Sequence, residues 1–250
     1  LTAGPMPGDP YEIGTPADSW LDAVDRPTGP LRIGVASRSL AGPEFEPDCA
    51  AALERAVNAL EELGHRIETA DMPADPNLVA NLGGLMAAAT KVMIDDHLAE
   101  LGRELRDDDI ELFTRYIYDL ADGFDGSHVV RGLQTAELAA RRTATFFEQY
   151  DIYLSPTTRT VCPALGYYDT SKLEELLPIA ATPAAETAIF NTSGQPAASV
   201  PMGLDHNGVP LGVQIAAPFG REDLVLAVAG QLEQATPWST TAIWPPRPGD

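Results

Sequence analysis

The chain has 250 residues, enough for one large or two small domains, and a formal net charge of −21 at pH 7. A surface this acidic repels phosphate backbones, and the sequence has no compensating basic patch, which argues against nucleic-acid binding. No apolar run approaches the ~20 residues that span a bilayer, so no membrane-spanning segment is expected.

Residues 1–30 are rich in proline and glycine and have few periodic apolar positions, which predicts an extended connector. The start at Leu1 has no basic segment followed by an apolar run, so no signal peptide is expected. It also lacks an initiator methionine, and we therefore expect a fragment or a processed chain.

A strand, a helix and a second strand follow this connector. We predict strands at 31–36 and 65–70. Between them, residues 47–63 place their apolar side chains on one face of a helix that begins at a proline and ends before Gly64. Elements in this order and at this spacing form a βαβ unit, so the sheet is expected to be at least partly parallel.

The middle of the chain is predicted to be helical, with helices at 77–101, 109–122 and 129–150. Three aspartates, residues 107–109, precede the second helix, where acidic groups favour a helix start. We interpret these helices as covering elements. Lys91 lies in the first and is predicted to be solvated.

A buried strand is predicted next, at 151–158, and a long loop follows at 159–185 with a short helical piece near 171–177. Loops of this length in compact domains are often functional.

The stretch 186–234 begins as a loop and continues as a strand hairpin and a helix. The predicted elements are strands at 198–202 and 212–216, a turn at 207–210 and an amphipathic helix at 221–234. The tail from 237 to 250 is predicted to lack regular structure.

Three motifs carry a family resemblance. Residues 191–203 read N-T-S-G-Q-P-A-x-S-V-P-M-G, and from Gly208 the chain continues G-V-P-L-G-V-Q-I-A-A-P-F-G-R-E-D-L. Residues 151–157 read D-x-x-L-x-P-T. The order and spacing of these three motifs, and the positions of their glycines and prolines, resemble the C-terminal region of the amidase signature hydrolases. Ser193 and the pair at 216–217 depart from the usual family pattern.

The resemblance implies an α/β fold with three α/β/α layers around a mixed β-sheet. Residues 31–250 would be the C-terminal part of an amidase signature domain, and residues 1–30 a connector from a missing N-terminal half.

The resemblance also implies hydrolysis of a small-molecule carboxylic amide to an acid and ammonia or an amine. Family members use a Ser-Ser-Lys triad whose nucleophilic serine lies in a Gly/Ser-rich segment, N-terminal to the region seen here. This chain has no such segment, and its two lysines, Lys91 and Lys172, are not in the context of the catalytic lysine. We therefore expect the catalytic residues to lie outside the chain, in the N-terminal half of the same enzyme, and the chain alone to be inactive.

Polar residues near the motifs are the candidates for substrate binding. They are Thr157, Asn191, Thr192, Ser193 and Gly194. The functional interpretation is a pocket wall near the acyl-enzyme. For residues 191–194 the competing interpretation is turn chemistry, because such residues bend a backbone and satisfy its hydrogen bonds. For Thr157 it is a strand end that is hydrogen-bonded to its own loop.

Neither a metal site nor a cofactor is predicted, because the histidines lack metal-ligand spacing and no phosphate-binding motif occurs. The two cysteines, Cys49 and Cys162, have no CxxC neighbour, which favours a reducing cytoplasm. Cys162 is predicted to be a buried, inert thiol.

Two rival functions remain open. One is the A subunit of a tRNA-dependent amidotransferase, which has the same fold and binds partner subunits. The other is a non-catalytic binding or scaffold module.

An interrupted sheet would also leave exposed edges and apolar area, and a homodimer is one way for the chain to cover them.

Overall fold

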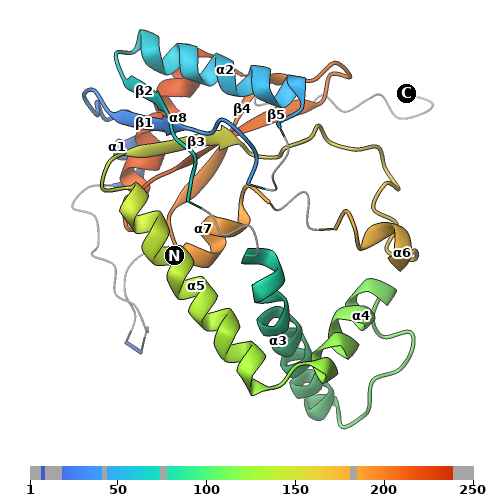
Figure 1. Ribbon diagram of the computed structural model, residues 1–250. Coiled ribbons are helices and arrows are strands. Elements are labelled where there is room, and N and C mark those ends of the chain that lie inside the picture. Colours follow the sequence, from blue (N-terminus) through green and yellow to red (C-terminus); the bar gives the residue numbers. More distant parts are fainter. Residues whose placement is uncertain (1–6, 9–18, 41–43, 74–77, 181–184, 239–250) are drawn as a thin grey trace.

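The computed structural model describes residues 7–8, 19–40, 44–73, 78–180 and 185–238. Its centre is a five-stranded sheet in the order β2-β1-β3-β5-β4 (Figure 1). The strands are β2 (Arg66–Thr69), β1 (Arg32–Val35), β3 (Ile152–Pro156), β5 (Pro210–Ala216) and β4 (Ala197–Leu204). The first three run parallel, whereas β5 is antiparallel to β3 and to β4. The sheet is therefore mixed, as predicted.

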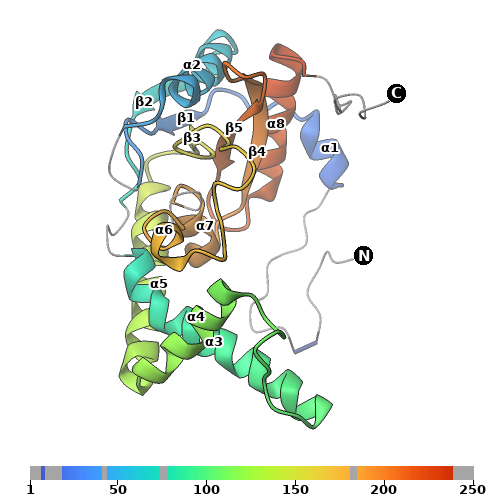
Figure 2. The same ribbon diagram turned by 90° about the vertical axis from the view of Figure 1, so that its right-hand side faces the viewer.

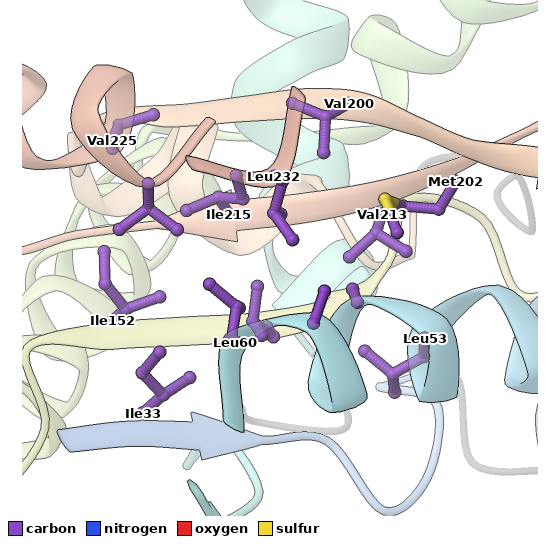
Figure 3. Packing of buried hydrophobic residues seen from close by; sticks show 14 of the residues in the cluster. Ile33, Leu53, Leu60, Ile152, Val200, Met202, Val213, Ile215, Val225 and Leu232 are labelled. Carbon is purple, nitrogen blue, oxygen red and sulfur yellow. The ribbon is translucent and has the colours of Figure 1, made fainter. Parts of the chain in front are cut away.

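Helices α2 (Pro47–Glu62) and α8 (Glu222–Ala235) cover one face of the sheet. Helix α2 begins at its proline, and the chain leaves it through Gly64, whose φ is +90°. Buried side chains from both helices meet those of the strands in one apolar core (Figure 3). Ile152 and Leu154 are β3's contribution to that core.

The opposite face of the sheet packs against α5 (Gly126–Phe146) and α7 (Ala188–Ser193). Side chains alternate along a strand, so Tyr153 points to this side, where it contacts Phe146 and Phe190. Helices on both faces of a mixed sheet give the predicted three-layer α/β/α arrangement.

A group of helices extends away from the sheet (Figures 1 and 2). It consists of α3 (Leu78–Leu101), α4 (Leu112–Leu120), the 3-10 helix η1 (Ala121–Gly123) and the far part of α5. The three predicted middle helices are thus confirmed with shifted ends. Many apolar side chains here are exposed: Met86, Val92 and Met93 on α3, and Val130, Leu133 and Leu138 on α5.

The Lys91 side chain contacts neighbouring residues, whereas we predicted a solvated side chain. Its Nζ lies 3.2 Å from the Asp122 carboxylate and 3.9 Å from the centre of the Tyr118 ring. The Tyr118 hydroxyl donates to Asp95 at 2.6 Å. The lysine therefore links α3 to α4 and η1.

Two short helices were not predicted. Helix α1 (Trp20–Val24) lies inside the expected extended connector, where the Ser19 hydroxyl caps its first turn and Ala23 is buried. Helix α7 replaces part of an expected loop. The short helical piece near 171–177 is confirmed as α6 (Leu173–Leu176). Most of residues 1–18 and the tail from 239 lie outside the described residues.

Helix α1 is held by close packing on α8, which gives a first prediction. A Cβ on Gly230 would lie 2.2 Å from the Val24 carbonyl oxygen, so Gly230→Ala should displace α1. We expect a lower Tm and a changed Trp20 fluorescence. The matched control is Gly83→Ala in α3, where a Cβ meets no atom within 4 Å and alanine favours the helix by roughly 0.5–1 kcal/mol. Equal effects of the two substitutions would contradict the packing of α1.

Candidate functional site

The four candidates from residues 191–194 form the end of α7 and its cap. Thr192 Oγ1 donates to the Ala188 carbonyl at 2.7 Å, and Ser193 Oγ donates to Ile189 at 2.7 Å. Both hydroxyls are thus bonded to their own helix. Gly194 has a φ of +80°, and its amide donates to the Phe190 carbonyl at 2.9 Å, which ends the helix.

Asn191 differs from its neighbours, because its side chain is exposed and has no hydrogen-bond partner among the described residues. The local chemistry of this segment is therefore that of a helix end, and Asn191 is its free polar group.

Thr157, the fifth candidate, follows the end of β3. Its amide donates to the Gly212 carbonyl at 2.9 Å. Its Oγ1 lies 2.6 Å from Ser199 Oγ on β4, a hydrogen bond that passes over the intervening strand β5. No hydrogen bond between described residues joins Thr157 directly to 191–194, so the five candidates form two groups.

A buried polar network, which the sequence did not predict, lies between those groups. The Glu186 carboxylate accepts a short hydrogen bond from the Ser39 hydroxyl and receives the Leu40 amide at 3.2 Å. Gln214 Nε2 donates to the Glu186 carbonyl at 3.0 Å and to Ser155 Oγ at 3.2 Å. Glu186 is only 1% exposed, and its polar partners in this network are buried too.

This network connects three parts of the fold. Ser39 and Leu40 follow β1, Ser155 and Gln214 face each other across β3 and β5, and Glu186 lies just before α7. In the sequence, the one indication of this buried network was Gln214, a polar residue inside an otherwise apolar strand.

Burial raises the pKa of the Glu186 carboxyl. The hydrogen bonds from Ser39 and Leu40 oppose this shift, as does the nearby charge of Arg159. The network thus contains a carboxyl group whose ionisation is disfavoured by its surroundings.

The remaining reactive side chains lie elsewhere. Cys162 is exposed, which corrects the prediction of a buried thiol, because its loop lies on the surface. His65 is buried, accepts the Leu31 amide at 3.1 Å and contacts Gln231 at 2.8 Å. His206 in the β4–β5 turn pairs with Asp48 at 2.7 Å, which raises the pKa of the imidazole. Within the described part of the chain, no three His, Cys, Asp or Glu side chains gather as a metal site would require.

A groove of about 430 Å³ lies between the end of β2 and the last turns of α5. Asp71, Arg142, Phe146 and Tyr150 are among its lining residues. It contains none of the five candidates. No helix in the described ranges is sufficiently long and apolar to span a membrane.

The sequence profile of the Amidase family matches residues 1–226. The chain belongs to the amidase family. A 6-aminohexanoate-cyclic-dimer hydrolase from Paenarthrobacter ureafaciens is 31% identical over 249 aligned positions, and the alignment covers 95% of this chain and 50% of that protein. A solved structure of a 6-aminohexanoate cyclic dimer hydrolase with its substrate has a TM-score of 0.87 and 32% identity, covering 94% of this chain and 51% of the other.

A more distant relative is the A subunit of the glutamyl-tRNA(Gln) amidotransferase from a Picosynechococcus species. It is 27% identical over 254 aligned positions, and the alignment covers 94% of this chain and 51% of the relative. The chain thus spans about half the length of these relatives. The family and the α/β fold that the motifs implied are confirmed.

The buried network of this amidase-family chain gives a prediction for the pH dependence of its stability. Because folding raises the Glu186 pKa above its ordinary value of 4.5, the folded state holds this proton more tightly than the unfolded state. The carboxyl group's contribution to stability is complete below pH 4.5 and is lost as the pH rises through the folded pKa.

Glu186→Gln keeps an acceptor for Ser39 and Leu40 but has no proton to lose. We therefore expect the variant to gain stability relative to wild type as the pH rises above about 4.5. Urea unfolding at a series of pH values measures this difference. A difference that is independent of pH, or that changes in the opposite direction, would refute the assigned shift.

Proposed function

We propose that this chain is the C-terminal portion of an amidase that hydrolyses a carboxylic amide to an acid and ammonia or an amine. The observation that carries the proposal is the match of nearly the whole chain to half of an amide hydrolase, in sequence and in structure. The nucleophilic serine would lie in the other half, because no Gly/Ser-rich segment occurs here.

In the proposed mechanism, a lysine acts through a bridging serine as the base for the nucleophilic serine. That serine attacks the amide carbonyl, backbone N–H groups stabilise the oxyanion, and water releases the acid. The present chain would supply no catalytic group. It would supply strands of the sheet and one wall of the acyl pocket.

The proposed wall consists of the end of α7 and the start of the loop after β3. Asn191 suits the task best, since an exposed carboxamide that bonds none of the residues the structure describes can both donate to and accept from an amide substrate. Thr192, Ser193 and Gly194 would set its position. The buried Glu186 network in turn fixes α7 against the sheet.

The partner would be the N-terminal half of the same enzyme. The exposed apolar side chains of α3 and α5 are consistent with a missing cover, because a large apolar surface is unfavourable in water. A homodimer could cover the same residues. The proposed location is a reducing cytoplasm, where free thiols such as Cys49 and Cys162 persist.

A second candidate function follows from the amidotransferase relative. An amidotransferase of this kind would release ammonia from glutamine and depend on partner subunits. The acidic chain without a basic patch weighs against contact with tRNA. A glutaminase assay with and without partner subunits separates the two functions. A scaffold module would show neither activity.

The nucleophile's position gives a direct test. We expect a longer protein, which includes the segment encoded upstream of Leu1, to hydrolyse simple aryl or aliphatic amides. The 250-residue chain, purified free of longer species, should show no hydrolysis above background in the same assay. Activity of the short chain would mean that the nucleophile lies within it, and inactivity of the longer protein would count against the amidase assignment.

Two glycines with nearly the same backbone conformation test the pocket wall in the longer protein. Gly194 has a φ of +80° and Gly208 a φ of +81°, so valine at either position is strained by about 1–3 kcal/mol. Gly194→Val should shift Asn191, and a displacement of ~1 Å near the reacting carbonyl reduces the rate on the order of a hundredfold.

Gly208→Val, in the β4–β5 turn, should lose stability but little kcat/KM. Both values need correction for the folded fraction, taken from thermal unfolding. If Gly194→Val also keeps near-normal kcat/KM, residues 191–194 are only a helix end.

A further inference from the structure

Arg159 lies in the loop after β3, and the backbone that carries it is fixed against the start of α2. The Glu46 amide donates to the Arg159 carbonyl at 3.0 Å. The Val161 amide in turn donates to the Glu46 carboxylate at 2.9 Å. Glu46 is the residue that precedes α2. These two hydrogen bonds hold the loop on either side of the arginine, so its side chain starts from a defined place.

The Arg159 side chain is half-buried but has no polar partner in the described part of the chain. Its Nε is shielded from solvent and makes no hydrogen bond, and no described carboxylate forms an ion pair with the guanidinium. Other half-buried arginines in the described ranges do lie within ion-pair distance of a carboxylate; they are Arg26, Arg103 and Arg115. A charge that is partly removed from water is unfavourable unless a partner compensates it. Arg159 is therefore an arginine that is prepared for an anion.

The guanidinium lies near the buried network that precedes α7. Burial raises the pKa of the Glu186 carboxyl and of the Cys49 thiol, and the positive charge of Arg159 acts against both shifts, which requires a short distance. Glu186 does not serve as the missing partner, because its carboxylate accepts from Ser39 and Leu40 instead. The charge of the arginine is thus placed near both elements of the proposed pocket wall, the loop after β3 and α7.

We propose that Arg159 binds a carboxylate on the acyl part of the amide substrate, which makes the enzyme selective for acidic amides. This inference rests on the proposed function and names a substrate class for the same site. A guanidinium presents two parallel N–H donors to the two oxygens of a carboxylate, which suits an arginine whose Nε has no partner. One guanidinium supplies one positive charge, and a chain with a net charge of −21 disfavours a doubly charged group such as phosphate.

The test compares acidic and neutral substrates of equal chain length in the longer protein. The substrates are the mono-4-nitroanilides of succinic, glutaric and adipic acid, each paired with the nitroanilide of butyric, valeric or hexanoic acid. Release of 4-nitroaniline gives kcat/KM for both members of a pair. Their ratio measures the preference for a carboxylate, and it is independent of the folded fraction because both substrates are measured on one sample.

The variants change the charge and the donor geometry separately. Arg159→Gln removes the charge, and Arg159→Lys keeps the charge but loses the paired donors. Arg66→Gln is the matched control, since Arg66 is exposed and begins β2, at the edge of the sheet opposite to the end of β3. Thermal unfolding of each variant shows whether it folds.

We expect the wild type to prefer the acidic member of at least one pair by about tenfold or more, because a shielded charge pair contributes strongly to binding. Arg159→Gln should reduce that ratio by about tenfold or more, mainly through KM, and Arg159→Lys should reduce it by roughly threefold or more. Arg66→Gln should keep the wild-type ratio.

Two results would overturn the assignment of Arg159. One is an unchanged ratio in both Arg159 variants with a lower Tm, because the arginine would then only stabilise the loop and the Glu186 network. The other is an equal loss of kcat/KM for the acidic and the neutral substrates. If Arg159→Gln does not fold, an unchanged ratio in Arg159→Lys decides against the proposal in the same way.

Failure of the proposed function has a different outcome. In that case the wild-type longer protein would hydrolyse none of the nitroanilides, and the role of Arg159 would fall with the amidase assignment. A wild type that hydrolyses the neutral substrates as well as the acidic ones overturns the substrate class alone.

Discussion

A single buried carboxylate, that of Glu186, connects the parts of the molecule that matter most for its proposed role. A buried ionisable group is costly unless its hydrogen bonds are satisfied. Here Ser39 and Leu40 bond the carboxylate, and Gln214 bonds the carbonyl of the same residue. These bonds join Glu186, just before α7, to residues that follow β1 and to β5, so the arrangement fixes α7 relative to the sheet.

The two faces of the sheet make different kinds of contact, and the alternating residues of β3 show this difference. Ile152 and Leu154 point into the apolar core formed with α2 and α8. On the other face, Tyr153 packs among aromatic side chains, whereas Ser155 and then Thr157 form polar contacts. The face changes from aromatic to polar along one strand, and the candidate Thr157 lies where it becomes polar.

The elements with clear periodicity could be predicted from the sequence. The βαβ unit and the β4–β5 hairpin have apolar patterns that their burial explains, and the three middle helices were predicted although many of their apolar side chains are exposed. Helix α7 was missed because residues 191–194 have the composition of a turn, and that composition also suits the end of a helix with Gly194 as its cap. Helix α1 was missed because five residues are too few to show a period.

The polar network was beyond prediction for a different reason. Glu186 and Ser39 are 147 residues apart, and nothing in the local sequence of either indicates the other. The same holds for Thr157 and Ser199, which meet only because Gly212 lies between their strands. Local sequence patterns predict helices and strands, whereas contacts between residues far apart in the sequence depend on how those helices and strands pack.

Amide hydrogen exchange tests most directly whether the Glu186 network holds α7 on the sheet. In Glu186→Ala, we expect the Phe190 and Gly194 amides to exchange at least tenfold faster, while amides in α2 keep their wild-type protection. Local opening of α7 would produce that pattern. Unchanged exchange at Phe190 and Gly194, or an equal increase throughout the protein, would contradict the role assigned to the network.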